Sequence, residues 1–204
     1  MDKLISKIEN YPDDFLAIKK QAKKYLSNNS NIDDNETLNI FHRPWVAPLN
    51  WGLILYTAAR KNWLDQFEQK TRKTIPNFYK KFLTTMNGCF IYDLSLYGLP
   101  PSFYLKETLD RSQLQCQDLL AANNEWILEY NVDKNYFHFG SRAYSHDQNV
   151  GYFFWNDEIR SVRTDGKTVS TWNNFSDFLD NEILEAENMM LEEVPKGTKI
   201  SSDE

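Results

Sequence analysis

The stretch "IPNFYKKFLTTMNGCFIY", residues 75–92, decides the fold because it contains a helix, the end of that helix and the start of a strand. Pro76 suits the first turn of a helix, where its missing N–H would be unpaired in any case. Gly88, preceded by Asn87, can adopt the left-handed backbone that ends many helices. The apolar run from Cys89 to Leu94 predicts a buried strand. Apolar side chains recur between these signals at helical spacing, at Phe78, Tyr79, Phe82, Leu83 and Met86.

The residues before this stretch predict helices and one extended segment. A short helix ends at Tyr11-Pro12, and Asp13 or Asp14 can start a second one. Two prolines exclude one continuous helix from "FHRPWVAPLNW", so we expect this segment to lie extended against the core, held by Trp45 and Trp51. From Leu53 to about Arg72 the spacing of apolar residues predicts a further helix.

The residues after this stretch alternate between strand and helix patterns. "SLYG" predicts a short strand, and residues 110–130 predict a helix capped by Asp110 or Ser112. "YFHFGSRA", "VGYFFWN" and "EIRSVRT" predict three strands, "DGK" at 165–167 a turn, and "NNFSDFL" the start of a last helix. Because the strands do not alternate regularly with helices, we expect an α+β fold with a mostly antiparallel central sheet flanked by helices.

Three parts of the chain are predicted from these patterns. Residues 1–52 form an N-terminal helical extension packed on the core, 53–184 form the α+β domain, and 185–204 form an acidic, partly disordered tail.

Composition excludes several classes of function. The formal net charge of −6 argues against nucleic acid as a direct partner, because phosphate binding needs a concentration of Lys and Arg. There is no secretory signal and no apolar run long enough for a membrane span. The two cysteines, Cys89 and Cys116, suggest reduced thiols and no disulfide framework. We therefore expect a soluble cytoplasmic protein that does not bind a membrane.

The motifs resemble the SUKH superfamily, which includes yeast cell-wall-assembly regulators and many bacterial immunity proteins. The resemblance covers roughly residues 55–184 and leaves residues 1–50 outside. It begins with "WLDQFEQ" and continues through Ile75-Pro76, Tyr79, Phe82-Leu83, Asn87-Gly88 and "LYG". "FHFGSRAYSHDQNVGYFFW" is similar to the central strands, although His146-Asp147 stands where a Gly-Asp pair is frequent. "TWNNFSDFLDNEI" is similar to the start of the closing helix.

The resemblance implies an α+β fold, no catalytic set and no cofactor. It implies a non-enzymatic protein that binds and neutralises a cognate protein toxin, such as a basic nuclease. The alternative is a regulatory or scaffold module without a toxin partner. The oligomeric state stays open.

The candidate catalytic and metal-binding residues have simpler structural explanations. His138 and His146 are eight residues apart, with Asp147 beside the second histidine, and no third metal ligand is apparent. His138 alternates with Phe137 and Phe139, as a residue on the polar face of a half-buried strand would. Neither cysteine has the nearby base that a catalytic thiol needs. No phosphate-binding glycine loop or nucleophile motif is present. We therefore expect no catalytic residues and no metal site.

Two charged segments each permit two readings. Basic residues between 60 and 81 form either a patch or the solvated faces of two helices. The acidic segment "DNEILEAENMMLEE" either offsets this charge or attracts a basic partner.

The predicted partner-binding residues lie around the sheet and its loops. They are Asp147, Gln148, Trp155, Asp157 and Glu158. They are chosen for expected exposure and charge, and because aromatic residues at a surface mark interface hot spots.

Overall fold

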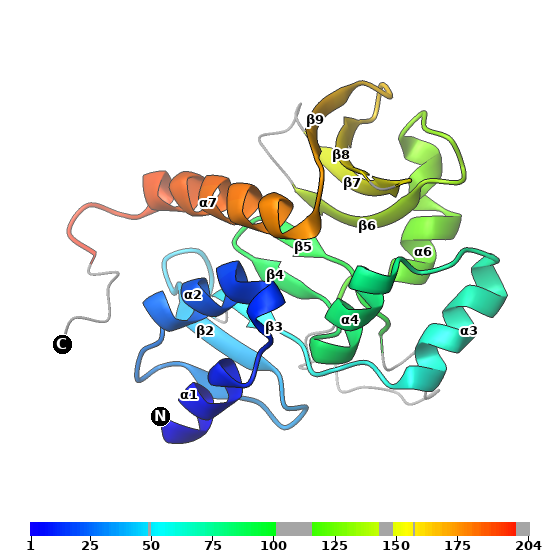
Figure 1. The fold of residues 1–204 in the computed structure, drawn as a ribbon. Coiled ribbons are helices and arrows are strands. Elements are labelled where there is room, and N and C mark those ends of the chain that lie inside the picture. The colour runs from blue at the N-terminus through cyan, green and yellow to red at the C-terminus, as the bar shows by residue number, and fades with distance from the viewer. Residues whose placement is uncertain (49, 101–115, 143–148, 157, 199–204) are drawn as a thin grey trace.

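The computed structural model describes residues 1–198 except 49, 101–115, 143–148 and 157, and residues 199–204 also lie outside the description. In the described part, one antiparallel sheet has nine strands in sequence order (Figure 1). The strands are β1 (Asn31–Ile32), β2 (Leu38–His42), β3 (Trp51–Leu55), β4 (Cys89–Ile91), β5 (Leu94–Leu96), β6 (Phe137–Arg142), β7 (Val150–Trp155), β8 (Glu158–Arg163) and β9 (Thr168–Trp172).

Helices cover this sheet, so the fold is α+β as predicted. They are α1 (Asp2–Glu9), α2 (Leu16–Lys24), α3 (Lys61–Thr71), α4 (Asn77–Thr85), α6 (Leu119–Asn124) and α7 (Phe175–Glu193), with the 3₁₀ turns η1 (Asp13–Phe15) and η2 (Trp126–Glu129). None of the helices in the described ranges has the length and apolarity that crossing a membrane requires.

An aromatic core joins the sheet to the helices. Phe139 on β6 contacts Tyr79 of α4, with ring centroids 5.4 Å apart, and Phe178 of α7 at 5.3 Å. Tyr152 on β7 contacts the same Phe178 at 4.9 Å. These four side chains are fully buried, and burying each ring stabilises the fold by about 1.5–3 kcal/mol. Successive side chains on a strand point to opposite faces, so a second, smaller core of Ile127, Tyr130, Phe153 and Val162 lies on the other face.

The opening stretch folds largely as predicted. Pro76 precedes α4, and Tyr79, Phe82 and Leu83 are its buried residues. Gly88 has the predicted left-handed backbone, with φ of 85°, but it lies beyond Met86, which is already extended. Gly88 therefore directs the chain into β4 and does not cap the last turn of α4.

The predicted helix from Leu53 is wrong for its first residues. Trp51–Leu55 forms β3, where Leu53 pairs with Ile40 of β2 and Ile91 of β4. The helix α3 begins only at Lys61. A short apolar run has no period of its own, so pairing with strands on both sides decides its conformation.

The N-terminal residues share the core of the rest of the chain. Ile8, Phe15 and Ile18 are fully buried, and Phe15 contacts Phe78 and Phe82 of α4 at 5.6 and 5.7 Å. Figure 1 shows α1 and α2, in blue, side by side, with α7, in orange, next to α2. Besides these helices, residues 31–52 contribute strands, so this part is not purely helical. The division of the chain at residues 52 and 184 stays a prediction.

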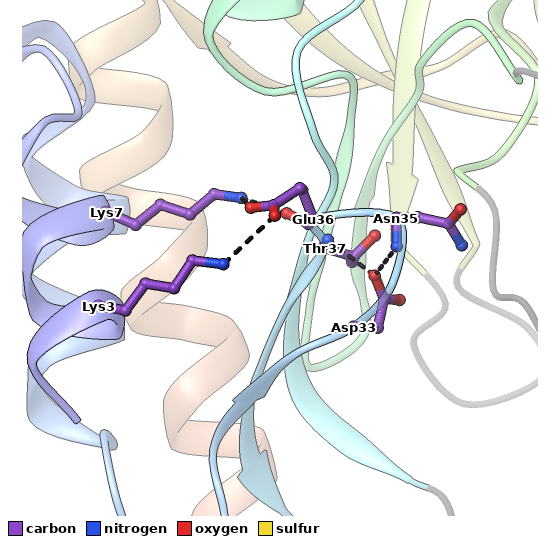
Figure 2. Close-up of polar contacts among 6 residues, drawn as sticks. All are labelled: Lys3, Lys7, Asp33, Asn35, Glu36 and Thr37. Carbon is purple, nitrogen blue, oxygen red and sulfur yellow. Dashed lines mark hydrogen bonds and ion pairs between the residues drawn. The ribbon is translucent and has the colours of Figure 1, made fainter.

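Figure 2 shows how the turn between β1 and β2 is joined to α1. The carboxylate of Glu36 accepts hydrogen bonds from Lys3 and Lys7, each 3.3 Å long, and Lys7 also donates to the carbonyl oxygen of Glu36. The Asp33 carboxylate shapes the turn by accepting the Thr37 N–H over 2.9 Å. These lysines lower the pKa of Glu36, but such exposed ion pairs contribute little to stability, and burial of Leu4 and Ile8 holds α1 in place.

The acidic segment after residue 184 continues α7 as far as Glu193. Ala186, Glu187 and Met190 are buried. Lys24, the last residue of α2, contacts the Glu187 carboxylate over 2.8 Å, and the hydroxyl of Tyr25, which follows it, donates a hydrogen bond to the same carboxylate. The buried positions recur at helical spacing, but the many acidic residues around them make this pattern hard to detect in the sequence.

Candidate functional site

Two of the five predicted partner-binding residues lie together at the end of the β7–β8 hairpin. Trp155 and Glu158 are directly opposite each other in the register of the two strands. Asn156, with a left-handed φ of 54°, begins the turn between them. Asp147, Gln148 and Asp157 lie outside the described residues. The structure therefore places one aromatic and one acidic candidate at the same partly exposed edge.

A tyrosine that sequence reasoning missed completes this edge. The ring of Tyr136 stacks on Trp155 with centroids 4.5 Å apart and an interplanar angle of 25°. The Tyr136 ring also meets Phe153 of the smaller core edge-on, with centroids 5.9 Å apart. Phe137 pairs with Phe154, so Tyr136 comes opposite Trp155 once the strand register is known. That register is the signal by which Tyr136 could have been found.

Arg160 fixes this aromatic pair in place. Its Nη2 donates to Glu158 over 2.7 Å, and its Nη1 donates to the Tyr136 hydroxyl over 3.0 Å. The hydrogen bond to Glu158 raises the pKa of Arg160. We call Tyr136, Trp155, Glu158 and Arg160 the aromatic edge. Its rings are partly exposed yet held by defined contacts, which reduces the entropy lost when a partner binds.

A hollow of about 380 Å³ lies beside the aromatic edge. It is lined by the α3–α4 connection, by the end of α6 with η2, and by the residues before β6. Lys73 connects it to the aromatic edge, because its Nζ donates to the carbonyl oxygen of Tyr136 over 2.8 Å. Burial lowers the pKa of Lys73 to about 8, although the negative charge of Asp133 acts in the opposite direction and favours the protonated amine. Arg72 and Lys134 also line the hollow, and Leu128 at its margin is 78% exposed.

The predicted basic cluster on α3 and α4 is partly neutralised by ion pairs. Lys80 contacts Glu68 at 2.8 Å and Lys81 contacts Asp14 at 2.6 Å. These pairs favour the reading of solvated helix faces over a nucleic-acid patch.

His138 is a structural residue, and it is more buried than predicted. It is fully buried on the smaller-core face, where it stacks on Phe153 at 4.5 Å. Its ring nitrogens lie 3.3 Å from the carbonyl oxygen of Ala122 and 3.1 Å from that of Gly140. Burial lowers its pKa to about 3, so the ring is neutral at physiological pH. His146 and Asp147, its suggested companions, lie outside the described residues.

The thiols are buried as predicted for small apolar residues. Cys89 and Cys116 are both free and at most 5% exposed. Burial raises the pKa of each thiol, which opposes formation of the nucleophilic thiolate. In the described part of the chain, no group of three or more His, Cys, Asp or Glu side chains is placed to hold a metal ion.

Comparison with known proteins matches the central part of the chain. A sequence model of the SMI1 / KNR4 family (SUKH-1) matches residues 58–181. The match includes the opening stretch and β4 to β9, and it ends inside α7. A search of curated proteins finds no match. Residues 1–57, before the match, add α1, α2 and the strands β1–β3 to the same sheet and core.

Proposed function

The chain belongs to the SMI1 / KNR4 family (SUKH-1), and we propose that it is a bacterial immunity protein that neutralises a cognate toxin by direct binding. This role is the one that the family resemblance implies for most bacterial members. The net charge of −6 favours association with a basic toxin such as a nuclease. We place this binding in the cytoplasm, where the two free thiols stay reduced.

The single observation that carries the proposal is the aromatic edge. Trp, Tyr and Arg are the residues most enriched among interface hot spots, and this edge presents all three in fixed positions. The hollow beside it can receive a polar or acidic side chain between Arg72 and Lys134. Asp147, Gln148 and Asp157, the other proposed contact residues, lie outside the described part of the chain.

We propose that neutralisation occurs without catalysis. The groups best suited to chemistry, His138, Cys89 and Cys116, are buried, and burial holds each in its uncharged form. A partner would instead be blocked by an interface of ordinary size, about 1,600 Å² in total.

The test is co-expression with the toxins encoded beside the gene, followed by measurement of binding and cell survival. We expect one toxin to bind and to be neutralised. Trp155→Ala should weaken binding by at least tenfold, because loss of a hot-spot residue costs about 2 kcal/mol or more. Val169→Ala, which alters an exposed side chain on β9, is the matched control and should leave affinity unchanged.

The outcomes separate the function from the surface. Failure of every neighbouring toxin to bind would reject the immunity role and favour the regulatory or scaffold module. Binding and protection that are insensitive to Trp155→Ala would keep the immunity role but exclude the aromatic edge as the contact surface.

A further inference from the structure

The outer face of α7 has an unusual combination of charge and exposed leucines. The acidic residues of the whole helix are Asp177, Asp180, Glu182, Glu185, Glu187, Glu192 and Glu193, of which Glu182 and Glu187 are buried, and the helix contains no Lys, Arg or His. Leu184 is 57% exposed and Leu191 is 38% exposed. Because they are seven residues apart, these leucines lie on one stripe of the helix.

Two of these acids form ion pairs within the described part of the chain. Glu182 contacts Arg142 at 3.3 Å and accepts a hydrogen bond from Tyr152, and Glu187 contacts Lys24 at 2.8 Å. The other acids of α7 make no ion pair with any residue in the described part of the chain. Asp177 accepts a hydrogen bond from the Asn174 side chain, and Glu193 acts electrostatically on Arg43. The charges of Asp180, Glu185 and Glu192 are therefore the ones most available to a partner.

The exposed charges at the C-terminal end of α7 are unfavourable for the helix itself, whereas Asp177 in the first turn suits the helix dipole. Glu192 and Glu193 lie at the C-terminus, where the helix dipole favours cations, and the last turn has no basic residue. The stability of α7 comes from its buried face, with Phe178 and Ile183. A basic segment lying along the outer face would remove this electrostatic cost and cover the two leucines.

We propose that the outer face of α7, with Leu184 and Leu191 at its centre, is a docking surface for a basic, partly apolar segment of a protein partner. This inference rests on the proposed function and adds the chemistry of the toxin segment that is bound. A second copy of the chain is disfavoured because it would bring two acidic helices together, and nucleic acid is disfavoured by the same repulsion.

The test uses two variants of the full chain and the toxin found by co-expression. Leu184→Ser with Leu191→Ser removes the apolar stripe, and Asp180→Asn with Glu185→Gln and Glu192→Gln removes charge. We expect at least a tenfold loss of affinity for the leucine variant. The charge variant should associate at least fivefold more slowly, and its rate should depend less on salt.

Matched controls alter the same chemistry elsewhere. Ile5→Ser with Val46→Ser changes exposed apolar residues, and Asp34→Asn with Asp65→Asn and Glu125→Gln removes the same charge. Both controls should bind as the unaltered protein does. Circular dichroism and thermal melting of each variant identify any loss of folding.

The outcomes keep this inference separate from the proposed function. Normal affinity and association rate in both α7 variants, with binding still lost in Trp155→Ala, would overturn the α7 surface and leave the immunity role intact. If no toxin binds, a synthetic amphipathic Lys/Leu peptide is titrated against the labelled protein by NMR. Shifts confined to the Leu184 and Leu191 methyl groups would support the surface, and an unperturbed α7 would overturn it.

Discussion

The side chain of Asn87 pairs with the backbone of Leu99 in both directions. Its Nδ2 donates to the Leu99 carbonyl oxygen over 2.8 Å, and its Oδ1 accepts the Leu99 N–H over 2.7 Å. Asn87 is 2% exposed, so water cannot replace these bonds. Asn87 of the "MNG" motif therefore binds the residue that directly follows "LYG", and this contact joins the chain entering β4 to the chain leaving β5.

We predict that Asn87→Ala lowers the free energy of unfolding by about 2–4 kcal/mol. The variant leaves a buried N–H and a buried carbonyl without their partner, and each such group costs about 1–3 kcal/mol. Urea denaturation measures the change, with Asn124→Ala at an exposed position as the control. Equal stability of the two variants would show that the Asn87 contact is dispensable.

Gly98 is required by the same contact. A Cβ atom at this position would lie 2.1 Å from the carbonyl oxygen of Asn87. Because that oxygen belongs to the backbone, the two segments must separate to admit a methyl group. We predict that Gly98→Ala costs about 3 kcal/mol of stability, at the upper end for overpacking. Thermal melting against Thr57→Ala, an exposed control, checks this, and an unchanged melting temperature would contradict it.

Local signals in the sequence predict the helices and strands in which the spacing of apolar residues coincides with the spacing of buried positions. The helix α4 follows from Pro76 and its apolar spacing, and β6, β7 and β8 follow from their runs of aromatic and branched residues. The strand β9 was missed because "TVSTW" has four exposed residues in a row and exists through pairing with β8. The strand β3 was missed for the related reason that it exists through pairing with β2 and β4 on its two sides.

The candidate site was predictable only where single residues carried the signal. Trp155 is conspicuous in a sequence, but its contact with Tyr136 depends on the register of β6 and β7. The hydrogen bond from Arg160 to the Tyr136 hydroxyl depends in addition on the position of β8. The hollow is assembled from three separate segments, so no local pattern indicates it.

The end of α7 gives a prediction about truncation. A chain that ends at Val194 should keep its full stability, because the buried residues of α7 all precede that point. A chain that ends at Leu184 loses the buried side chains of Ala186 and Met190 and the contacts of Glu187 with α2. We expect that chain to lose at least about 3 kcal/mol, the cost of removing one large core side chain. Urea denaturation of both chains decides, and equal stability would mean that residues 185–194 do not support the fold.

His138 gives a prediction about acid stability, and its sign follows from its burial. The pKa is about 3 in the folded state and about 6.5 when unfolded, so the unfolded chain binds one more proton between these values. Stability from the neutral ring is fully present above pH 6.5 and is lost as pH falls toward 3, by up to about 1.4 kcal/mol per pH unit. His138→Gln, which does not titrate, should show a weaker decline of stability between pH 6.5 and 4 in urea denaturation. In the unaltered protein, the NMR signal of the His138 ring should stay constant from pH 8 to pH 5. A titrating signal, or parallel stability curves for the two proteins, would contradict the buried neutral ring.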